Sequence, residues 1–407
     1  MAAEQITTSR PPAIRWQIAL AFLAFILIGA NDGGIGVILP SLRIYYAIDK
    51  ATLGFLFLAG TAGYLTAGFS SGLVLEKLGQ RSFLMLGGAA FVLGMSIVSL
   101  RPLFGWLLVP FYIAGFGAGI IDAGLNAYIA RLPNSTPVLN YLHAFYAAGA
   151  FVGPMIATGI IASGASWNSL YLVWMVTGLV VLAGFTRLYN RRSQAGNQER
   201  DTTEPGGNIL AAAFKMRIVW LAAIFLLFYT GAEVTINNWG YTYLTEYRRQ
   251  QIILSGGMVS GYWAGLMFGR LVLGKLSERI SNRRLILGCL IGVMVGLCIV
   301  WVIPGSLATA VGLFMTGFCL GPIFPTTIAL MPELLPDRIV ATAIGFLASF
   351  AAAGSALMPF LAGNLAQGIG LWTLMPFVMA LALADLGIWL FLERRSNRAA
   401  APKPNQL

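Results

Sequence analysis

Long apolar stretches alternate with short polar ones along the whole chain. Twelve stretches of about 20 apolar residues are separated by charged residues, proline or glycine, and this is the length of a helix that crosses a bilayer. The period-two alternation of a membrane barrel is absent from them. The pattern therefore predicts an all-α membrane protein with twelve transmembrane helices. They lie near 16–39, 51–75, 82–100, 104–130, 138–163, 168–189, 217–244, 255–276, 284–303, 306–331, 339–365 and 370–392.

One long polar segment, 190–208, divides these stretches six and six and has the composition of a flexible linker. We expect a six-helix bundle over 1–189, a cytoplasmic linker over 190–214 and a second six-helix bundle over 215–407. The halves are weakly similar at an offset of about 202 residues, as two parallel repeats would be. Gly29-Ala30 matches Gly231-Ala232, and Gly115 and Gly119 match Gly317 and Gly321. Such repeats indicate alternating access about a site in the middle of the membrane.

Composition supports this interpretation. Apolar residues make up 58% of the chain, charged residues 10%, and mean hydropathy is +0.78, so there is too little charge to cover a water-facing surface. The net charge of +11 comes from residues dispersed among loops, which excludes a nucleic-acid-binding face. Twenty Lys and Arg residues fall on one side of the predicted membrane and five on the other. The positive-inside rule then predicts a multi-pass protein of the cytoplasmic (inner) membrane with both termini in the cytoplasm.

Residues for covalent or metal chemistry are few. The three cysteines lie inside apolar stretches without a CxxC pair, the chain has a single histidine, and it contains no phosphate-binding loop. These features predict no enzyme, no metal and no cofactor. The first apolar run is too long for a cleavable signal peptide, so we expect it to be retained.

Acidic side chains inside the spans are the strongest functional signal. Asp32 follows Asn31 in the first span, Asp122 lies in the fourth, and Glu233 follows Gly231-Ala232 in the seventh. An acid inside a bilayer is costly unless it is paired, hydrated or neutralised, so it marks a site by default. Asp32, Asp122 and Glu233 are our candidates for proton coupling, and Asp32 and Glu233 also for substrate binding.

Other polar residues lie close to these acids in the sequence. Asn126 stands one helical turn beyond Asp122, and His143 in the fifth span is a fourth candidate for proton coupling or a structural hydrogen-bond partner. Asn237, Asn238 and Trp239 follow Glu233. Amides beside an aromatic face suit a neutral polyhydroxylated ligand. Asn31, Asn126, Asn237, Asn238 and Trp239 are therefore candidate substrate ligands.

A polar turn after the second span carries Gly72, Glu76, Lys77, Gly79 and Arg81, and a copy in the second half carries Glu278 and Arg279. This turn resembles the signature loop of the major facilitator superfamily, and the resemblance covers essentially the whole chain. It implies a gating role for these residues. We add Arg270, the one strongly intramembrane base, to the gating group.

Within that superfamily, Gly115–Tyr128, the run from Asn140 through His143 to Tyr146, and Gly354–Pro359 resemble the fucose:proton symporter branch. The resemblance implies that Asp32 and Asp122 hold the two acidic positions of that branch, that Tyr146 belongs to the binding site, and that the protein is a monomer. Gly321–Pro325 and Gly354–Pro359 place glycine and proline in mid-span, where we expect hinges.

The sequence thus predicts a secondary transporter for a small neutral solute, a sugar, coupled to protons. The alternatives are a proton-driven exporter of amphipathic drugs or metabolites and an uncoupled sugar facilitator. An anionic substrate is disfavoured because spans one and seven lack a central Arg or Lys. A receptor that kept the fold without transporting is disfavoured by the retained core acids.

Overall fold

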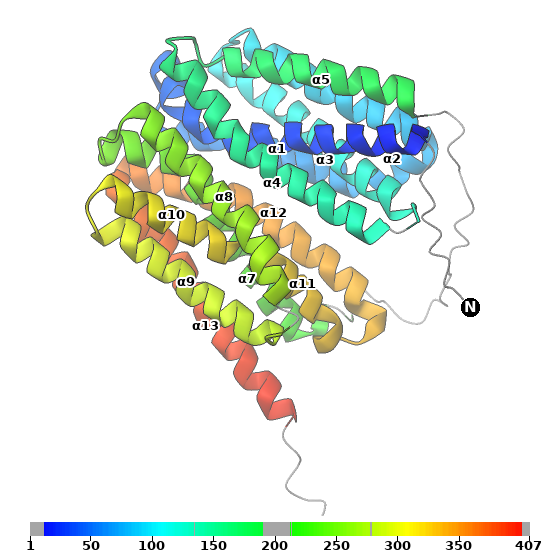
Figure 1. Ribbon diagram of the computed structural model, residues 1–407, viewed down its shortest axis with the longest axis vertical. Coiled ribbons are helices and arrows are strands. Elements are labelled where there is room, and N and C mark those ends of the chain that lie inside the picture. The colour runs from blue at the N-terminus through cyan, green and yellow to red at the C-terminus, as the bar shows by residue number, and fades with distance from the viewer. Residues whose placement is uncertain (1–11, 134, 190–211, 213, 277–278, 401–407) are drawn as a thin grey trace, which may run out of the picture.

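The computed structural model describes residues 12–133, 135–189, 212, 214–276 and 279–400, and these are almost entirely helical. The first half contains α1 (Pro12–Tyr46), α2 (Lys50–Ser99), α3 (Phe104–Ala130), α4 (Ser135–Ala162) and α5 (Ser169–Leu188). The second half contains α7 (Arg217–Thr242), η1 (Tyr243–Tyr247), α8 (Ile252–Leu276), α9 (Asn282–Val302), α10 (Ser306–Leu320), α11 (Ile323–Leu334), α12 (Asp337–Gly368), η2 (Leu371–Thr373) and α13 (Leu374–Ala400). Figure 1 shows the two halves as two helical bundles.

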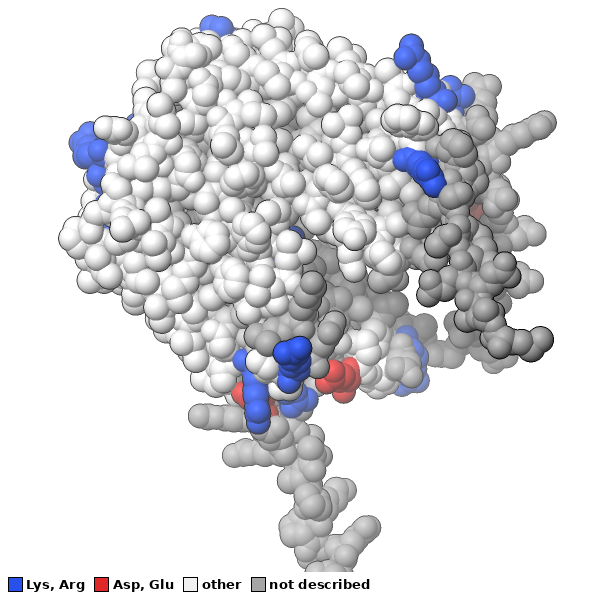
Figure 2. All heavy atoms as spheres, in the orientation of Figure 1, with Lys and Arg blue, Asp and Glu red and all other residues white. Residues whose placement is uncertain are grey.

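Eleven helical segments in the described part of the chain are long and apolar enough to cross a membrane. The 50-residue α2 contains two of the predicted spans, because its backbone turns at Gly79 with φ 73° and ψ 164°. Only glycine adopts that conformation without strain. Counting α2 twice gives the twelve predicted spans. Most of the visible surface between the charged ends is free of Lys, Arg, Asp and Glu (Figure 2), as expected of a belt that faces lipid.

The predicted linker over 190–214 falls largely on residues outside the described ranges, so its boundaries stay a prediction. At one expected hinge the helix is interrupted, since the tenth span is divided at Gly321–Pro322 into α10 and α11; movement there stays a prediction. The other is not, because α12 runs unbroken through Gly354–Pro359. There Gly354 allows close packing, and a Cβ on it would overlap the carbonyl of Leu227 in α7.

Glycine contacts show that the two halves repeat one packing scheme. Gly63 of α2 lies against the carbonyl of Tyr112 in α3, and 202 residues later Gly265 of α8 lies against the carbonyl of Phe314 in α10. In the same way Gly115 packs on Gly60. The matching pair in the second half is Gly317 and Tyr262. In a bilayer the hydrophobic effect does not drive helices together, so association depends on close packing. Small residues such as glycine allow the helix backbones to approach closely.

The bundles touch at one end and separate toward the other. The hydrogen bonds, ion pairs and ring contacts described between them lie from mid-membrane to the end that carries Glu246, which we call the Glu246 end. The opposite end, where α2 bends at Gly79, is the Gly79 end. In Figure 1 the bundles meet at the left and diverge to the right, toward the Gly79 end.

Candidate functional site

Asp32 lies at the middle of α1, where α1 packs tightly on α4. Gly29 and Gly33 have no room for a Cβ because the backbone of α4 occupies that space. This close approach brings Tyr146 of α4 to the acid, and its hydroxyl donates to Asp32 Oδ2 at 3.0 Å. Asn31 Nδ2 donates to Asp32 Oδ1 at 3.2 Å. Asp32 is thus held by a tyrosine and by the amide of Asn31.

Asp122 of α3 is held in a similar way. The Tyr64 hydroxyl of α2 donates to its Oδ2 at 2.7 Å, and Asn126 Nδ2 donates to its Oδ1 at 2.9 Å. Asp122 lies within electrostatic range of Asp32. Tyr64 is 39% exposed although its hydroxyl faces this acid.

His143 is exposed on α4 and lies within electrostatic range of both Asp122 and Arg270, which belong to different bundles. Its ring meets Phe25 edge-to-face with centroids 5.7 Å apart. No hydrogen bond from His143 to Asp122 is among those described. His143 therefore approaches Asp122 closely enough for an electrostatic interaction, but the two side chains are not joined by a described hydrogen bond.

Glu233 is buried on α7, and its Oε2 accepts a 2.5 Å hydrogen bond from the hydroxyl of Tyr229, one turn earlier. Its backbone carbonyl accepts from Tyr262 of α8 at 3.0 Å. Glu233 also lies within electrostatic range of Arg270, although the two form no ion pair within 4 Å in the described part of the chain. It therefore resembles the other two acids in having a tyrosine hydroxyl as its partner.

Arg270 of α8 is anchored at the break between α10 and α11. Its Nε donates to the carbonyl of Gly321 at 3.2 Å. This carbonyl has no helical donor because Pro325, four residues later, lacks an N–H. The base thereby satisfies a backbone acceptor inside the membrane region, where such an acceptor is costly to leave unpaired. Arg270 thus contacts the break between α10 and α11 and also lies within electrostatic range of Glu233.

A hydrogen-bonded group of Asn237, Asn238 and Trp263 links the second bundle to the backbone of Asp32 in the first. Asn237 Nδ2 donates to the backbone carbonyl of Asp32 at 2.8 Å and to Asn238 Oδ1 at 2.9 Å, while its own Oδ1 accepts from Trp263 Nε1 at 2.7 Å. Both asparagines are 3% exposed. Asn237 has its hydrogen-bonding groups engaged by protein, so in this conformation it couples α1 to α7 and α8.

Trp239, predicted beside these residues, points elsewhere. Its Nε1 donates to the Pro359 carbonyl of α12 at 2.8 Å, and its ring meets Phe57 of α2 edge-to-face. It therefore packs between the bundles toward the Glu246 end and not beside the acids. The sequence placed it one residue from Asn238, but successive helical residues point about 100° apart.

The predicted gating residues lie at the Gly79 end. Gly72, Glu76 and Lys77 are exposed, and the described ion pairs do not include them. Arg81 reaches the end of α5, where Nη2 donates to the Thr186 carbonyl at 2.7 Å. Arg279 is exposed, and Glu278 lies outside the described residues.

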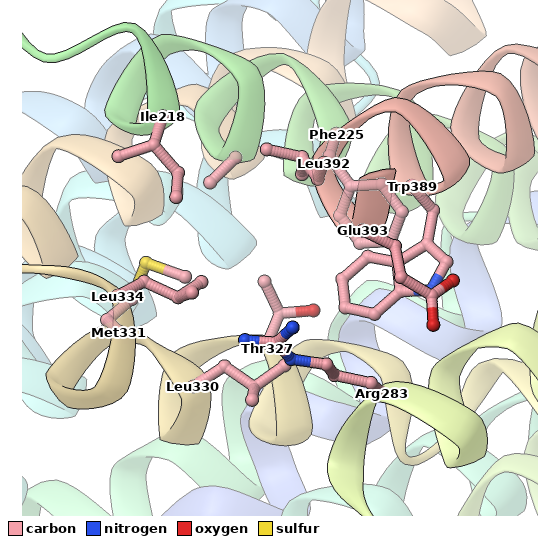
Figure 3. A pocket seen from close by; sticks show the side chains of 11 residues that line it. Ile218, Phe225, Arg283, Thr327, Leu330, Met331, Leu334, Trp389, Leu392 and Glu393 are labelled. Atoms are coloured by element: carbon pink, nitrogen blue, oxygen red, sulfur yellow. The ribbon is translucent and has the colours of Figure 1, made fainter. Parts of the chain in front are cut away.

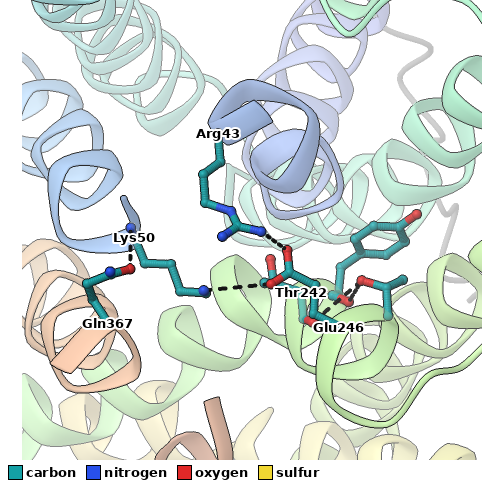
Figure 4. Close-up of polar contacts among 7 residues, drawn as sticks. Arg43, Lys50, Thr242, Glu246 and Gln367 are labelled. Carbon is teal, nitrogen blue, oxygen red and sulfur yellow. Dashed lines mark hydrogen bonds and ion pairs between the residues drawn. The ribbon is translucent and has the colours of Figure 1, made fainter. Parts of the chain in front are cut away.

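An ion cluster at the Glu246 end was not predicted. Arg43 Nη2 of α1 lies 2.7 Å from Glu246 Oε1, and Lys50 Nζ of α2 lies 3.7 Å from Glu246 Oε2 (Figure 4). Gln367 of α12 also accepts from the Lys50 backbone N–H at 3.2 Å. Arg43 and Glu246 are 203 residues apart in the chain, so no local pattern in the sequence pairs them.

Sequence reasoning also missed the aromatic partners Tyr64, Tyr229, Tyr262 and Trp263, because their importance depends on which helices meet. It missed Asp385 of α13 too, which is 2% exposed. Asp385 carried the same signal as Asp32, an acid in the middle of an apolar span.

The family model of the Major Facilitator Superfamily matches residues 21–258 and 242–406. "Bypass of stop codon protein 6" of Saccharomyces cerevisiae is 25% identical over 402 residues, covering 88% of this chain and 79% of that protein. The glucose/mannose transporter GlcP of Bacillus subtilis is 22% identical over 385 residues, covering 92% and 94%.

Solved structures agree on the fold. A mutant of the nucleoside transporter NupG aligns with a TM-score of 0.79 at 13% identity, covering 93% of this chain and 99% of that one. A mutant of the E. coli fucose:proton symporter FucP aligns with a TM-score of 0.62 at 16% identity, covering 93% and 98%. Together with the family match, these alignments confirm the predicted fold. The chain belongs to the Major Facilitator Superfamily, whose members are membrane transporters.

Proposed function

We propose that this protein carries a small neutral solute, a sugar, across the cytoplasmic membrane by alternating access and couples this movement to protons. The observation that carries the proposal is a set of three acid–tyrosine pairs, two in the first bundle and one in the second. The pairs are Asp32–Tyr146, Asp122–Tyr64 and Glu233–Tyr229. Tyr146 links the set across the interface, since it lies within electrostatic range of Glu233 and Tyr64 as well as Asp32.

Each pair offers what a polyhydroxylated ligand needs. A carboxylate accepts hydrogen bonds and a tyrosine hydroxyl both donates and accepts, so a sugar hydroxyl can replace either partner of the pair. A charged acid in a closing, water-poor site must be neutralised, and a proton does this without occupying space. The sugar-transporting relative GlcP favours this substrate class.

The orientation follows from the charge bias of the loops. With both termini in the cytoplasm, the Gly79 end faces the cytoplasm and the Glu246 end faces outward. The structure then corresponds to the inward-facing state of a monomer, in which His143 is exposed. Opening outward requires breaking the Arg43–Glu246 contact and the Asn237 bond to Asp32.

The proposal is tested in proteoliposomes with a panel of radiolabelled hexoses and pentoses and an imposed inward proton gradient. We expect one sugar to accumulate against its gradient in the wild type. We expect Asp32→Asn or Asp122→Asn to keep exchange of that sugar and to lose accumulation, while Tyr146→Phe weakens sugar binding. Asp49→Asn, which changes an exposed acid at the Glu246 end, is the matched control and should transport normally.

Two outcomes contradict parts of the proposal. Uptake that only equilibrates and ignores the proton gradient would make the protein a facilitator and the acids substrate ligands. Absence of uptake for every sugar, with proton-driven efflux of amphipathic dyes, would make it an exporter.

A further inference from the structure

Two buried hydroxyls are left unpaired where one bundle meets the other. Thr158 of α4 is 5% exposed and Ser260 of α8 is 2% exposed. Thr158 Oγ1 and Ser260 Oγ are both buried and have no hydrogen-bond partner in the described part of the chain. A polar group that leaves water without gaining a partner raises the free energy of the folded state, so each such group calls for an explanation.

The helices offer both hydroxyls a partner that they do not use. Serine and threonine inside a helix can donate to the carbonyl one turn earlier. Thr66, Thr177 and Thr316 do so in this protein, at 2.8, 2.9 and 2.7 Å. Thr158 and Ser260 form no such bond. Their hydroxyls are therefore available to a group outside their own helices.

Both residues lie at the contact between α4 and α8, which belong to different bundles (Figure 1). A Cβ on Gly256 of α8 would overlap Thr158 Oγ1, so the threonine hydroxyl lies directly against the α8 backbone. Ser260 follows Gly256 by one helical turn and shares its face of α8. Thr158 is four residues before the end of α4, and Gly256 is four residues after the start of α8. The contact is therefore at the Glu246 end.

The same face of α8 leads inward to the acids. Trp263, three residues after Ser260, donates to Asn237, and Asn237 donates to the backbone carbonyl of Asp32. Ser260 is eight residues from the start of α8, or about 12 Å at 1.5 Å per residue. It therefore lies between the Glu246 end and the hydrogen-bonded group beside Asp32.

The contact between α4 and α8 is uncharged. Residues 147–162 of α4 and 252–269 of α8 include no Asp, Glu, Lys, Arg or His. A hydroxyl both donates and accepts, so it can pair with another hydroxyl without a charge that must be neutralised. The chemistry that matches these two groups is that of a neutral, hydroxyl-rich solute.

A cavity inside the second bundle does not supply their missing partner. It has a volume of about 30 Å³ and lies among α7, α9, α11 and α13. Its wall is mainly apolar, with side chains such as Phe225 and Leu330 (Figure 3). Neither Thr158 nor Ser260 lines it, so the partner has to come from the space that opens between the bundles.

We propose that Thr158 and Ser260 form an outer binding surface for the hydroxyl groups of the transported solute. The surface is covered in this structure and becomes exposed when the bundles separate at the Glu246 end. The unpaired hydroxyls make the closed contact less favourable, and pairing with solute or water offsets this once the end is open. A solute that enters from outside then meets Thr158 and Ser260 before it reaches Asp32. The inference rests on the proposed transport of a hydroxylated solute by alternating access.

Thiol labelling tests the exposure, in cells that express the full-length protein with its three native cysteines replaced by serine. Thr158→Cys and Ser260→Cys should react with a membrane-impermeant methanethiosulfonate reagent added outside. The matched controls are Gly159→Cys and Gly261→Cys, the next residue along each helix, where an added Cβ meets no neighbour within 4 Å. These controls have the same depth but point away from the contact. They should react at least about tenfold more slowly, because a thiol in apolar surroundings stays protonated.

Holding the Glu246 end open should raise the labelling rate further. Gly256→Leu should accelerate the reaction of Ser260→Cys, because a side chain at Gly256 cannot fit against Thr158 in the closed contact. Gly257→Leu, which meets open space, should leave the rate unchanged. Glu246→Gln provides a second way of opening this end if Gly256→Leu fails to fold. Labelling of Ser260→Cys that is no faster than that of Gly261→Cys, with or without these opening changes, would overturn the proposal.

Removing the hydroxyls separates binding from exposure. With the sugar that the uptake panel identifies, Thr158→Val should raise the half-saturating external concentration about tenfold, as expected for one lost hydrogen bond. Thr158→Ser, which keeps the hydroxyl, should stay within about twofold of the wild type by the same reasoning. Ser260→Ala should behave like Thr158→Val. Half-saturating concentrations unchanged in both Thr158→Val and Ser260→Ala would overturn the binding role.

This proposal and the transport proposal can fail separately. Labelling of Thr158→Cys and Ser260→Cys in a protein that takes up no sugar would support the outer surface and overturn the sugar as its solute. Sugar uptake without labelling at either position would leave the transport proposal intact and overturn the outer surface.

Discussion

Replacing Glu246 with glutamine tests whether the ion cluster holds the Glu246 end closed. Arg43 meets Glu246 at 2.7 Å, and both side chains are only about a quarter exposed, at 28% and 24%. A hydrogen bond to a charged group contributes about 1.5–3 kcal/mol, and partial exposure reduces this through screening. Lys50 at 3.7 Å adds a weaker attraction.

A net loss of about 1–2 kcal/mol corresponds to a factor of roughly 5 to 30 in an equilibrium constant. Glu246→Gln should therefore move the population by that factor toward states open at the Glu246 end. Spin labels at Ile44 of α1 and Ile253 of α8, which are 75% and 71% exposed at this end on different bundles, should show longer distances by double electron–electron resonance. The protein used for spin labelling has its three native cysteines, Cys289, Cys298 and Cys319, replaced with serine so that only the introduced cysteines react.

Two controls make this result specific. Asp49→Asn removes a charge at the same end without touching the bundle contact, and its distances should match the wild type. Arg43→Gln should shift the distances as Glu246→Gln does, and the double variant should add little, since the two residues form one interaction. Unchanged distances in Glu246→Gln would refute the reasoning and leave backbone packing as the force that closes this end.

Three further predictions concern backbone positions. Gly33→Ala should lower stability by about 1–3 kcal/mol because its Cβ has no space against α4, whereas Gly159→Ala, which faces open space, should not; thermal unfolding in detergent measures both. Gly79→Ala should cost about 1–3 kcal/mol from backbone strain at φ 73°, while Gly72→Ala at a helical position should be neutral or stabilising by the same assay. Asp49 caps α2, so Asp49→Ala should cost about 1 kcal/mol. That hydrogen bond lowers the pKa of Asp49 below its ordinary 3.8, so the contribution is full above that pH and is lost as pH falls below it.

The sequence was sufficient for the spans because each apolar run must be long enough to cross a bilayer. An intramembrane acid needs no structural context to attract notice, and this signal made Asp32, Asp122 and Glu233 candidates; their roles stay predictions, and Asp385 carries the same signal. The offset of 202 residues, seen first in paired glycines, is matched by paired helix contacts.

Partners were harder to predict than acids. Tyr64 and Asp122 are 58 residues apart in the chain, and only the packing of α2 on α3 brings them together. Trp239 shows the converse error, because sequence adjacency to Asn238 says nothing about the direction of a side chain. Glu246 was not singled out, since its cross-bundle partners Arg43 and Lys50 become visible only in the folded protein.

The glycine contacts between α1 and α4 have a consequence for engineering this protein. Asp32 on α1 and Tyr146 on α4 are fixed in register by Gly29 and Gly33, so a change on either helix disturbs both. Gly265 constrains α8 in the same way, since a Cβ there would overlap the Phe314 carbonyl of α10. A library aimed at new cargo should therefore keep Gly29, Gly33 and Gly265 unaltered.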